Sequence, residues 1–305
     1  MRTLTPKVER IASYTALVGE SAIWDRREEA LLWVDIMGRK VLRTRPTSGE
    51  TESWDFPEMT GFVQPADDGT LLVGQHDTIL KFDPADGSRR LFTRLEASVS
   101  GNRTNDACCD VQGRLWLGTM PLPETGLKPM GKLFRIDSDG SITLIESGLT
   151  IPNGIAFSPD GRTVYWADTP LTPFQVWRAR YDPETGMPGE KELFVKLPEG
   201  GGRPDGATVD ASGCYWLAAV RGSQLLRYTP EGKLDLTVRL PVARPTKIAF
   251  GGSDMKTMFV TSLSDGLAPE EKGPLDGSLL ALDLGIQGLP PTEFATPGVE
   301  GFAPA

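Results

Sequence analysis

Short apolar segments, several of them rich in aromatic residues, recur along the chain at nearly even spacing. Six such segments stand out, with central positions at Trp33, Leu72, Trp116, Tyr165, Trp216 and Phe259. The intervals between these positions are 39, 44, 49, 51 and 43 residues. A repeat of this length is typical of one four-stranded blade of a β-propeller, and helical periodicity is nearly absent. The pattern therefore predicts six blades.

Polar turns divide each repeat into strands. Pairs such as Asp68-Gly69 tolerate the backbone angles of a tight hairpin and precede the central segments. Fourth strands are expected at 51–57, 88–96, 141–149, 191–198, 233–241 and 291–297. Residues 8–14 also resemble a fourth strand, so either they or 291–297 could close the ring against the last blade. We expect one all-β domain over residues 1–305, a six-bladed β-propeller with four-stranded antiparallel blades around a central channel.

A polar residue recurs at the same phase of several repeats, about five residues before a polar turn. Up-and-down connectivity brings the first residues of the innermost strands to one face. The expected inner ring there reads Glu20, Phe62, Asn105, Asn153, Asp205 and Thr246. The same face carries the longest connections, 120–131, 168–174 and 263–277. Long loops over the mouth of a rigid scaffold are where binding sites usually lie.

The ring residues Glu20, Asn153 and Asp205 offer only oxygen ligands, which suit a hard or borderline divalent cation. Two carboxylates at a narrow axis repel each other and raise the pKa of one of them, and a bound cation removes that cost. The alternative is that each side chain only caps a strand end or holds a channel water. The common repeat phase of all three residues favours a metal site.

Composition removes other classes of function. The chain of 305 residues has a formal net charge of −9, whereas nucleic-acid binding calls for a basic face. No apolar run reaches the roughly 18 residues that a transmembrane helix needs, and the first residues lack the apolar core of a secretory signal. Three cysteines make no disulfide framework and are expected as buried apolar residues. We expect a cytoplasmic protein, a monomer or weak homo-oligomer, that binds neither nucleic acid nor membranes.

A single histidine, His76, limits the possible chemistry further. A His-rich zinc site is impossible, and a Ser-His-Asp triad would have to include this residue. His76 is expected at the end of a second strand on the same face as the polar ring, in substrate contact or packing rather than in acid–base catalysis. Asp168 ends another second strand there, and we expect it to support the ring rather than to bind a sugar hydroxyl.

Several short motifs follow one another along the chain. In order, they are Gly19-Glu20, Arg103-x-Asn105-Asp106, Gly118-Thr119-Met120, Pro152-Asn153-Gly154-Ile155, Pro204-Asp205-Gly206 and Phe250-Gly251-Gly252. Together they resemble the family of senescence marker protein (regucalcin), gluconolactonases and luciferin-regenerating enzyme. The resemblance covers nearly the whole chain. It implies a six-bladed propeller that holds one divalent metal ion (Ca²⁺, Zn²⁺, Mg²⁺ or Mn²⁺) and hydrolyses a sugar lactone.

The resemblance also implies roles for individual residues. Glu20, Asn153 and Asp205 would be the metal ligands, and Arg103 and Asn105 would contact substrate. Asp205 would also serve as the catalytic base, while the metal polarises the lactone carbonyl and activates water. Arg103 would stabilise the developing oxyanion. Glu124 lies one position later than the glutamate that contacts substrate in some relatives, so its role stays open.

Three hypotheses remain at this point. The first is a metal-dependent lactonase that opens an aldonolactone to the aldonic acid in cytoplasmic sugar breakdown. The second is a propeller that binds metal or a partner without catalysis, and the third is a hydrolase of another ester on the same fold. The charged ring beside Arg103 favours the enzyme, and the absence of a ring histidine argues against a histidine-dependent esterase.

Overall fold

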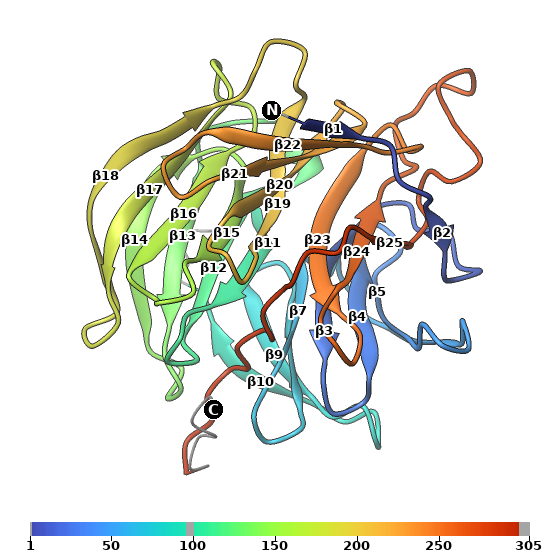
Figure 1. Ribbon diagram of the computed structural model, residues 1–305. Coiled ribbons are helices and arrows are strands. Elements are labelled where there is room, and N and C mark those ends of the chain that lie inside the picture. The colour runs from blue at the N-terminus through green and yellow to red at the C-terminus, as the bar shows by residue number, and fades with distance from the viewer. Residues whose placement is uncertain (1, 96–100, 299–305) are drawn as a thin grey trace.

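The computed structural model describes residues 2–95 and 101–298, and their strands form six sheets (Figure 1). Blade 1 contains β3 (Gly19–Asp25), β4 (Ala30–Asp35), β5 (Lys40–Thr44) and β6 (Thr51–Asp55). Blade 2 contains β7 (Phe62–Pro65), β8 (Leu71–Gly74), β9 (Thr78–Phe82) and β10 (Arg89–Arg94). Blade 3 contains β11 (Asn102–Cys109), β12 (Leu115–Pro121), β13 (Gly131–Ile136) and β14 (Ile142–Leu149).

The second half of the chain repeats this arrangement. Blade 4 contains β15 (Pro152–Phe157), β16 (Thr163–Asp168), β17 (Gln175–Asp182) and β18 (Met187–Lys196). Blade 5 contains β19 (Arg203–Val209), β20 (Tyr215–Val220), β21 (Gln224–Tyr228), β22 (Leu234–Arg239) and the N-terminal β1 (Arg2–Leu4). Blade 6 contains β23 (Pro245–Gly251), β24 (Thr257–Ser262), β25 (Leu280–Asp283) and β2 (Glu9–Arg10).

The first strands of the six blades line the axis. Strand β3 contacts β7, and the contacts continue through β11, β15, β19 and β23 back to β3. Consecutive strands within each blade pair antiparallel. This closed ring confirms the expected six-bladed β-propeller.

The N-terminal segment closes the ring. Strand β2 pairs antiparallel with β25, so that Glu9 lies opposite Ala281 and completes blade 6. The expectation that 291–297 forms a fourth strand is therefore wrong, because the outer edge of β25 is already occupied. Strand β1, also in the N-terminal segment, pairs in parallel with β22 of blade 5.

The segment that follows β25 instead crosses the end of the channel opposite the strand starts. Gly288 forms a bridge to Asp210 in blade 5, and Phe294 forms one to Ala66 in blade 2. The amide of Ala295 also donates to the carbonyl of Gly113 in blade 3. Phe294 is fully buried among core residues of blades 2 and 3. This crossing covers one end of the channel and leaves the other end as the approach to a site.

The core lies between neighbouring blades, as expected for stacked sheets with apolar faces. Every residue of β4 and of β20 is buried, as are the large side chains Trp33, Trp116 and Trp216. The expectation that the tryptophans serve blade packing is confirmed at these positions. Cys109 and Cys214 are buried, whereas Cys108 is partly exposed, and all three are free thiols. Desolvation raises the pKa of the Cys108 thiol to about 12, so this thiol stays protonated near neutral pH.

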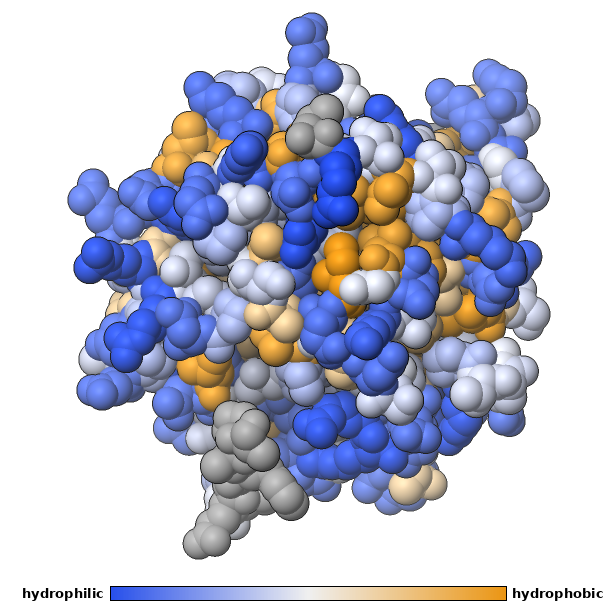
Figure 2. All heavy atoms as spheres, viewed as in Figure 1, coloured by the Kyte–Doolittle hydropathy of each residue, from blue (hydrophilic) through white to orange (hydrophobic). Residues whose placement is uncertain are grey.

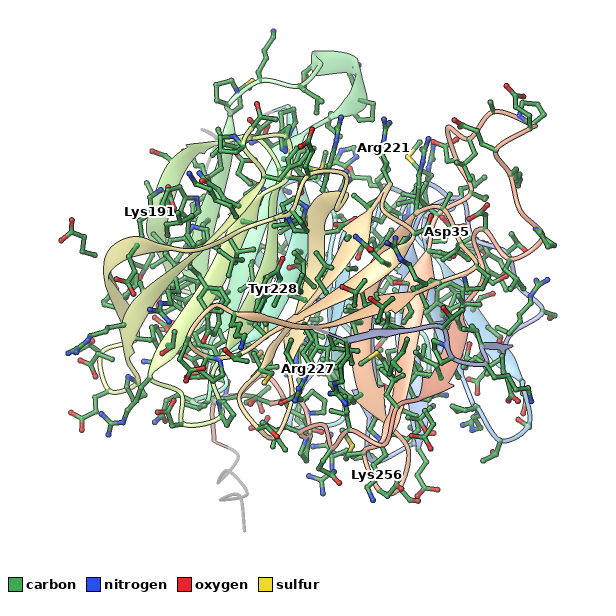
Figure 3. The ribbon with its side chains drawn as sticks, turned by 45° about the horizontal axis from the view of Figure 1, so that its top comes forward. Asp35, Lys191, Arg221, Arg227, Tyr228 and Lys256 are labelled. Carbon is green, nitrogen blue, oxygen red and sulfur yellow. The ribbon has the colours of Figure 1, made fainter. Side chains whose placement is uncertain are left out.

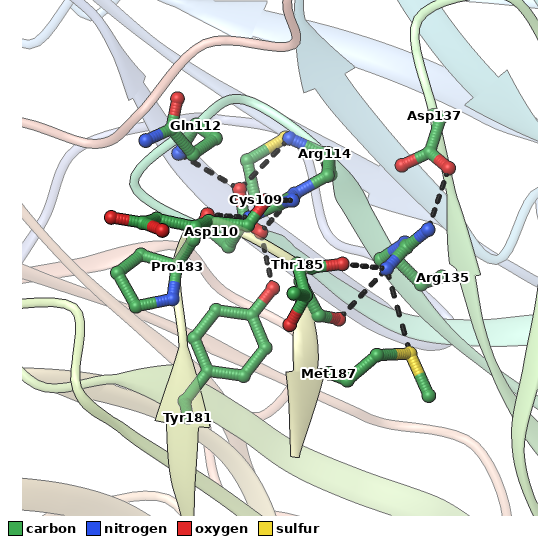
Figure 4. A network of polar contacts seen from close by, with 12 residues as sticks. Cys109, Asp110, Gln112, Arg114, Arg135, Asp137, Tyr181, Pro183, Thr185 and Met187 are labelled. Atoms are coloured by element: carbon green, nitrogen blue, oxygen red, sulfur yellow. Dashed lines mark hydrogen bonds and ion pairs between the residues drawn. The ribbon is translucent and has the colours of Figure 1, made fainter.

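Buried aspartates organise the turns at the covered end of the channel. Asp110 accepts hydrogen bonds from the backbone amides of Gln112 (2.9 Å) and Arg114 (3.0 Å), and from the Arg114 guanidinium (2.7 Å). The hydroxyl of Tyr181, from the neighbouring blade, donates to the same carboxylate (Figure 4). Arg135 extends this network to Asp137 and to the backbone of the β17–β18 turn. These contacts tie blade 3 to blade 4 away from the predicted site.

The face of the molecule seen in Figure 2 is mainly hydrophilic, with separate apolar areas between the polar side chains. Within the described residues there is no helix long and apolar enough to cross a membrane.

Candidate functional site at the open end of the channel

The predicted ring lies where the innermost strands are distorted. The pairing register shifts just after Glu20 in β3, after Thr104 in β11 and after Asn153 in β15. It also shifts after Pro204 in β19 and after Pro245 in β23. Strand β7 of blade 2 pairs without a shift. β-Bulges re-aim side chains and are frequent beside active sites.

The bulges explain why neighbouring residues serve the same site. In a regular strand, Asn105 and Asp106 would point to opposite faces. In β11, both reach other blades, because Asn105 bonds to blade 4 and Asp106 bonds to blades 4 and 6. The one unbulged blade supplies Phe62, which is fully buried against the core. Five blades are therefore shaped for polar groups at this end of the channel.

A directional chain of hydrogen bonds joins blades 3, 4 and 5. Arg103 Nη1 donates to Asn105 Oδ1 (3.0 Å), and Asn105 Nδ2 donates to Asn153 Oδ1 (2.9 Å). Asn153 Nδ2 then donates to Thr169 Oγ1 (2.7 Å), whose hydroxyl donates to the carbonyl of Pro204 (2.8 Å). The chain ends one residue before Asp205. It fixes the orientation of both amides and turns the carbonyl oxygen of Asn153 toward Asn105.

Glu20 and Asp205 face each other from blades 1 and 5. Asp205 is buried, and its pKa is raised well above the usual value by burial and by the charges of Glu20 and Asp106. A hydrogen-bonding contact with Glu20 raises it further. Glu20 keeps some solvent access, yet burial of its carboxylate and the charge of Asp106 raise its pKa to about 7. Two carboxylates in this position favour a shared proton or a cation.

Positive charge enters the site from two residues. The Arg103 guanidinium is buried and donates to the carbonyl of Thr104 (2.8 Å) as well as to Asn105. Burial lowers its pKa to about 10, although the charges of Glu20 and Asp205 act in the opposite direction. Lys247, on β23, forms an ion pair with Asp106 (Nζ to Oδ1, 2.5 Å). The sequence interpretation missed Lys247, the one charged residue of the inner strand β23.

The backbone just before β3 and β15 is held by carboxylates at the ends of the second strands β4 and β16. Asp168 accepts the backbone amides of Thr150 (2.9 Å) and Ile151 (2.7 Å). Asp35 does the same for Leu17 and Val18, both at 3.0 Å. Both oxygens of Asp168 are occupied in this way, which agrees with a supporting role.

Three other residues that the sequence analysis considered lie farther from this cluster or in other environments. Thr246 donates to the carbonyl of Gly19 (2.5 Å) and pairs with Thr261, so it joins blades 6 and 1. His76 is partly exposed, with Nδ1 3.9 Å from Glu58 Oε2, and its buried Nε2 has no hydrogen-bond partner among the described residues. Glu124 is exposed in a 3₁₀ turn, Pro123–Thr125. Their roles stay predictions.

The approach to the site is at the end of the propeller that carries the β20–β21 turn. Arg221 in this turn and Lys256 in the β23–β24 turn lie at opposite ends of the molecule (Figure 3). The long connections 122–130, 169–174 and 263–279 leave the ends of second strands on the Arg221 side. Leu127 and Leu171, in two of these connections, are exposed.

The donor set fits a divalent cation bound mainly by oxygen. Among the described residues, no three His, Cys, Asp or Glu side chains are arranged to hold a metal. A cation here would therefore need an amide oxygen in addition to the carboxylates of Glu20 and Asp205. Asn153 Oδ1 can supply one, because it accepts a single hydrogen bond from Asn105 Nδ2 and keeps a second lone pair. The raised pKa values of Glu20 and Asp205 are the electrostatic cost that such an ion would remove.

Several known proteins are similar to this chain in sequence and architecture. Residues 18–264 match the family described as SMP-30/Gluconolactonase/LRE-like region. A 6-deoxy-6-sulfogluconolactonase from Pseudomonas putida is 34% identical, over 92% of this chain and 96% of its own. A pentonolactonase from Haloferax volcanii is 34% identical, over 93% and 96%. The crystal structure of a calcium-binding protein, regucalcin, from Agrobacterium tumefaciens has a TM-score of 0.90 at 27% identity, covering 96% of this chain and 99% of that one.

Proposed function

This chain belongs to the SMP-30/gluconolactonase/LRE-like family, and we propose that it is a metal-dependent lactonase that opens a sugar lactone to the aldonic acid. The observation that carries the proposal is the pair of carboxylates from Glu20 and Asp205, with Asn153 and Arg103 beside it, at the open end of the channel. Relatives named for the hydrolysis of a sulfogluconolactone and a pentonolactone support the substrate class.

Glu20, Asn153 and Asp205 would hold the cation, as the oxygen donors of all three and the raised pKa values of the two carboxyl groups suggest. When bound, a divalent cation polarises a carbonyl oxygen and lowers the pKa of a coordinated water. Thr169 orients Asn153 by accepting from its amide nitrogen, so the carbonyl oxygen of Asn153 is the atom presented to the cation.

The remaining residues would bind and activate the lactone. Asp205 would accept a proton from the attacking water as the general base. Arg103 lies within the field of both carboxylates and remains cationic, with a pKa of about 10, so it can donate hydrogen bonds to the oxyanion that develops on the carbonyl oxygen. Asn105 Oδ1 accepts a hydrogen bond from Arg103 Nη1 and so fixes the orientation of the guanidinium. Asn105 would also contact the lactone next to Arg103.

A screen of γ- and δ-aldonolactones with a pH-indicator assay tests the reaction class. Ca²⁺, Mg²⁺, Mn²⁺ and Zn²⁺ should each be added separately to metal-stripped protein. We expect acid release from at least one lactone that depends on protein and on metal. Metal binding without turnover of any lactone would favour the non-catalytic propeller, and turnover confined to simple esters would favour the other hydrolase.

Chelation tests the dependence on metal. Exhaustive dialysis against EDTA should abolish lactone hydrolysis, and one divalent metal should restore it. Full activity in protein that elemental analysis finds free of metal would contradict the proposal.

A further inference from the structure

One ion pair crosses the channel next to the candidate metal ligands. Lys247 lies in the inner strand of blade 6 and Asp106 in that of blade 3, which are opposite blades of the six-membered ring. Only 8% of the Lys247 side chain and 3% of the Asp106 side chain are exposed. Desolvation of two charges is costly, so a buried pair is weak evidence for stability by itself. Its position at the channel calls for a functional explanation.

The second oxygen of Asp106 is also fixed. Asp106 Oδ2 accepts the backbone amide of Ile155 (2.9 Å), two residues after Asn153 in β15. With Oδ1 bound to Lys247 and Oδ2 bound to Ile155, the carboxylate is held by donors on both sides. Without these donors, Asp106 would be a third carboxylate free to join Glu20 and Asp205, since its charge already acts on both.

The chain makes room for Lys247 directly beside Asp205. A Cβ atom added to Gly206 would lie 2.3 Å from Lys247 Cδ and 2.7 Å from the carbonyl oxygen of Thr246. The glycine of the Pro-Asp-Gly motif therefore permits the lysine stem to pass over β19. Its counterpart Gly154 has a different role, because its φ of +66° requires a left-handed backbone.

We propose that Lys247 is a positioning residue that clamps Asp106 away from the metal site, so that a cation meets two carboxylates rather than three. This inference rests on the metal-dependent lactonase proposed above. A third carboxylate at the cation would bind the metal more tightly and would weaken its pull on the lactone carbonyl. Lys247 thus lowers the affinity of the site for the cation and increases the effect of the bound cation on the lactone carbonyl.

Two single variants should move metal affinity in opposite directions. Lys247→Met keeps the length of the stem and removes the charge, and we expect the Kd for Ca²⁺ and Mn²⁺ to fall about tenfold, because one unit of negative charge near the ion is left uncompensated. Asp106→Asn should raise the same Kd by a similar factor. The double variant should return the Kd close to that of the wild type. Isothermal titration calorimetry on metal-stripped protein measures all four values.

Turnover should separate from affinity. Lys247→Met saturated with metal should lose at least about tenfold in kcat on the best lactone, while its KM changes little, since the lysine does not touch substrate. The double variant should recover part of this loss. A purely structural role of the pair would instead weaken metal binding in both single variants.

A second buried lysine offers a matched control. Lys81 is also 8% exposed and pairs with Asp68 in blade 2, away from the ring. Lys81→Met should lower the melting temperature of the metal-free protein but leave Kd and kcat unchanged. The inference is overturned if Lys247→Met binds metal more weakly, or if it matches the wild type in both Kd and kcat.

The calorimetric arm also separates this inference from the proposed function. If every variant binds metal as expected and no protein hydrolyses a lactone, the reaction is wrong and the clamp stands. If Lys247→Met does not fold, Asp106→Asn and the double variant still decide the matter. Wild-type affinity in Asp106→Asn would then contradict the clamp.

Discussion

Two aspartates lie at the two ends of the inner strand β19, and different groups surround their carboxylates. Asp205 near its start is 7% exposed, and Asp210 just after its end is 0% exposed. Asp210 accepts the amides of Ser212 (2.9 Å) and Cys214 (3.1 Å), the indole of Trp216 (2.9 Å) and the guanidinium of Arg227 (2.8 Å). Four donors meet this one carboxylate.

Among the described residues, no comparable set of hydrogen-bond donors surrounds the buried carboxylate of Asp205. The side-chain contact found for its carboxylate is with another carboxylate, that of Glu20, and its pKa is raised by burial and by that neighbour. Burial alone therefore does not distinguish a functional aspartate from a structural one. The distinction lies in the partners, because a buried charge without donors is costly unless an ion or a substrate supplies the counter-charge.

The largest expected effect comes from removing Asp205. Asp205→Ala should lower kcat/KM by at least about a thousandfold, since general-base help alone contributes about 10²–10⁴ and a metal ligand is lost as well. The metal-free variant should be no less stable than the wild type, because the repulsion with Glu20 is gone. Lactone turnover and urea denaturation measure the two quantities. Destabilisation comparable to that of a core variant would show that Asp205 is structural.

Asp210 should respond in the opposite way. Asp210→Asn leaves Arg227, only 12% exposed, without one of its two carboxylate partners, and should cost about 3 kcal/mol of unfolding free energy. Activity per folded molecule should stay unchanged, because the residue lies at the covered end of the channel. Urea denaturation and active-site titration with metal check this. A loss of turnover in fully folded protein would break the comparison.

Arg103 tests the substrate side of the site. Arg103→Ala should lower kcat/KM by about a hundredfold, the scale of losing one oxyanion-hole donor. Metal binding should not weaken, because a guanidinium does not ligate a cation and its removal takes a positive charge away from Glu20 and Asp205. Arg103→Lys should recover only part of the activity, since an ammonium keeps the positive charge but lacks the planar donor geometry of a guanidinium. Wild-type turnover in Arg103→Ala would move the substrate pocket elsewhere.

The sequence predicted the fold because the signal was repeated six times. Each blade has an apolar second strand between polar turns, so errors at one repeat do not change the architecture. The closing strand was ambiguous because β2 has only two residues, Glu9 and Arg10, both exposed. Residues 291–297 looked like a strand because Phe294 is apolar, but its burial comes from covering the end of the channel.

The site was predictable only as far as one residue per repeat. Glu20, Asn105, Asn153 and Asp205 share a repeat phase, and the structure places them at bulged strand starts. The contact between Lys247 and Asp106 depends on β-bulges in the inner strands. A bulge breaks the in–out alternation of side chains, from which the faces of a strand are inferred. Their pairing also joins opposite blades, and no local pattern reports such a distance.

The smallest effect is expected where one donor of a well-compensated aspartate is removed. Asp110 is the counterpart of Asp210 in blade 3, and Tyr181 adds a hydroxyl to the three bonds from Gln112 and Arg114 (Figure 4). Tyr181→Phe keeps the packing of the ring against Trp116, whose centroid is 5.6 Å away. We expect a loss of about 2 kcal/mol, the contribution of one hydrogen bond to a charged group.

This small loss is informative because Asp110 keeps its other donors. Metal affinity and lactone turnover in Tyr181→Phe should equal those of the wild type, and urea denaturation should show a modest shift of the midpoint without a change of slope. A loss above about 3 kcal/mol would mean that Asp110 depends on the tyrosine as its main partner. In that event the carboxylate of Asp110, like that of Asp205, would lack sufficient compensation from its other hydrogen-bond donors. The contrast between the two ends of β19 would then not extend to blade 3.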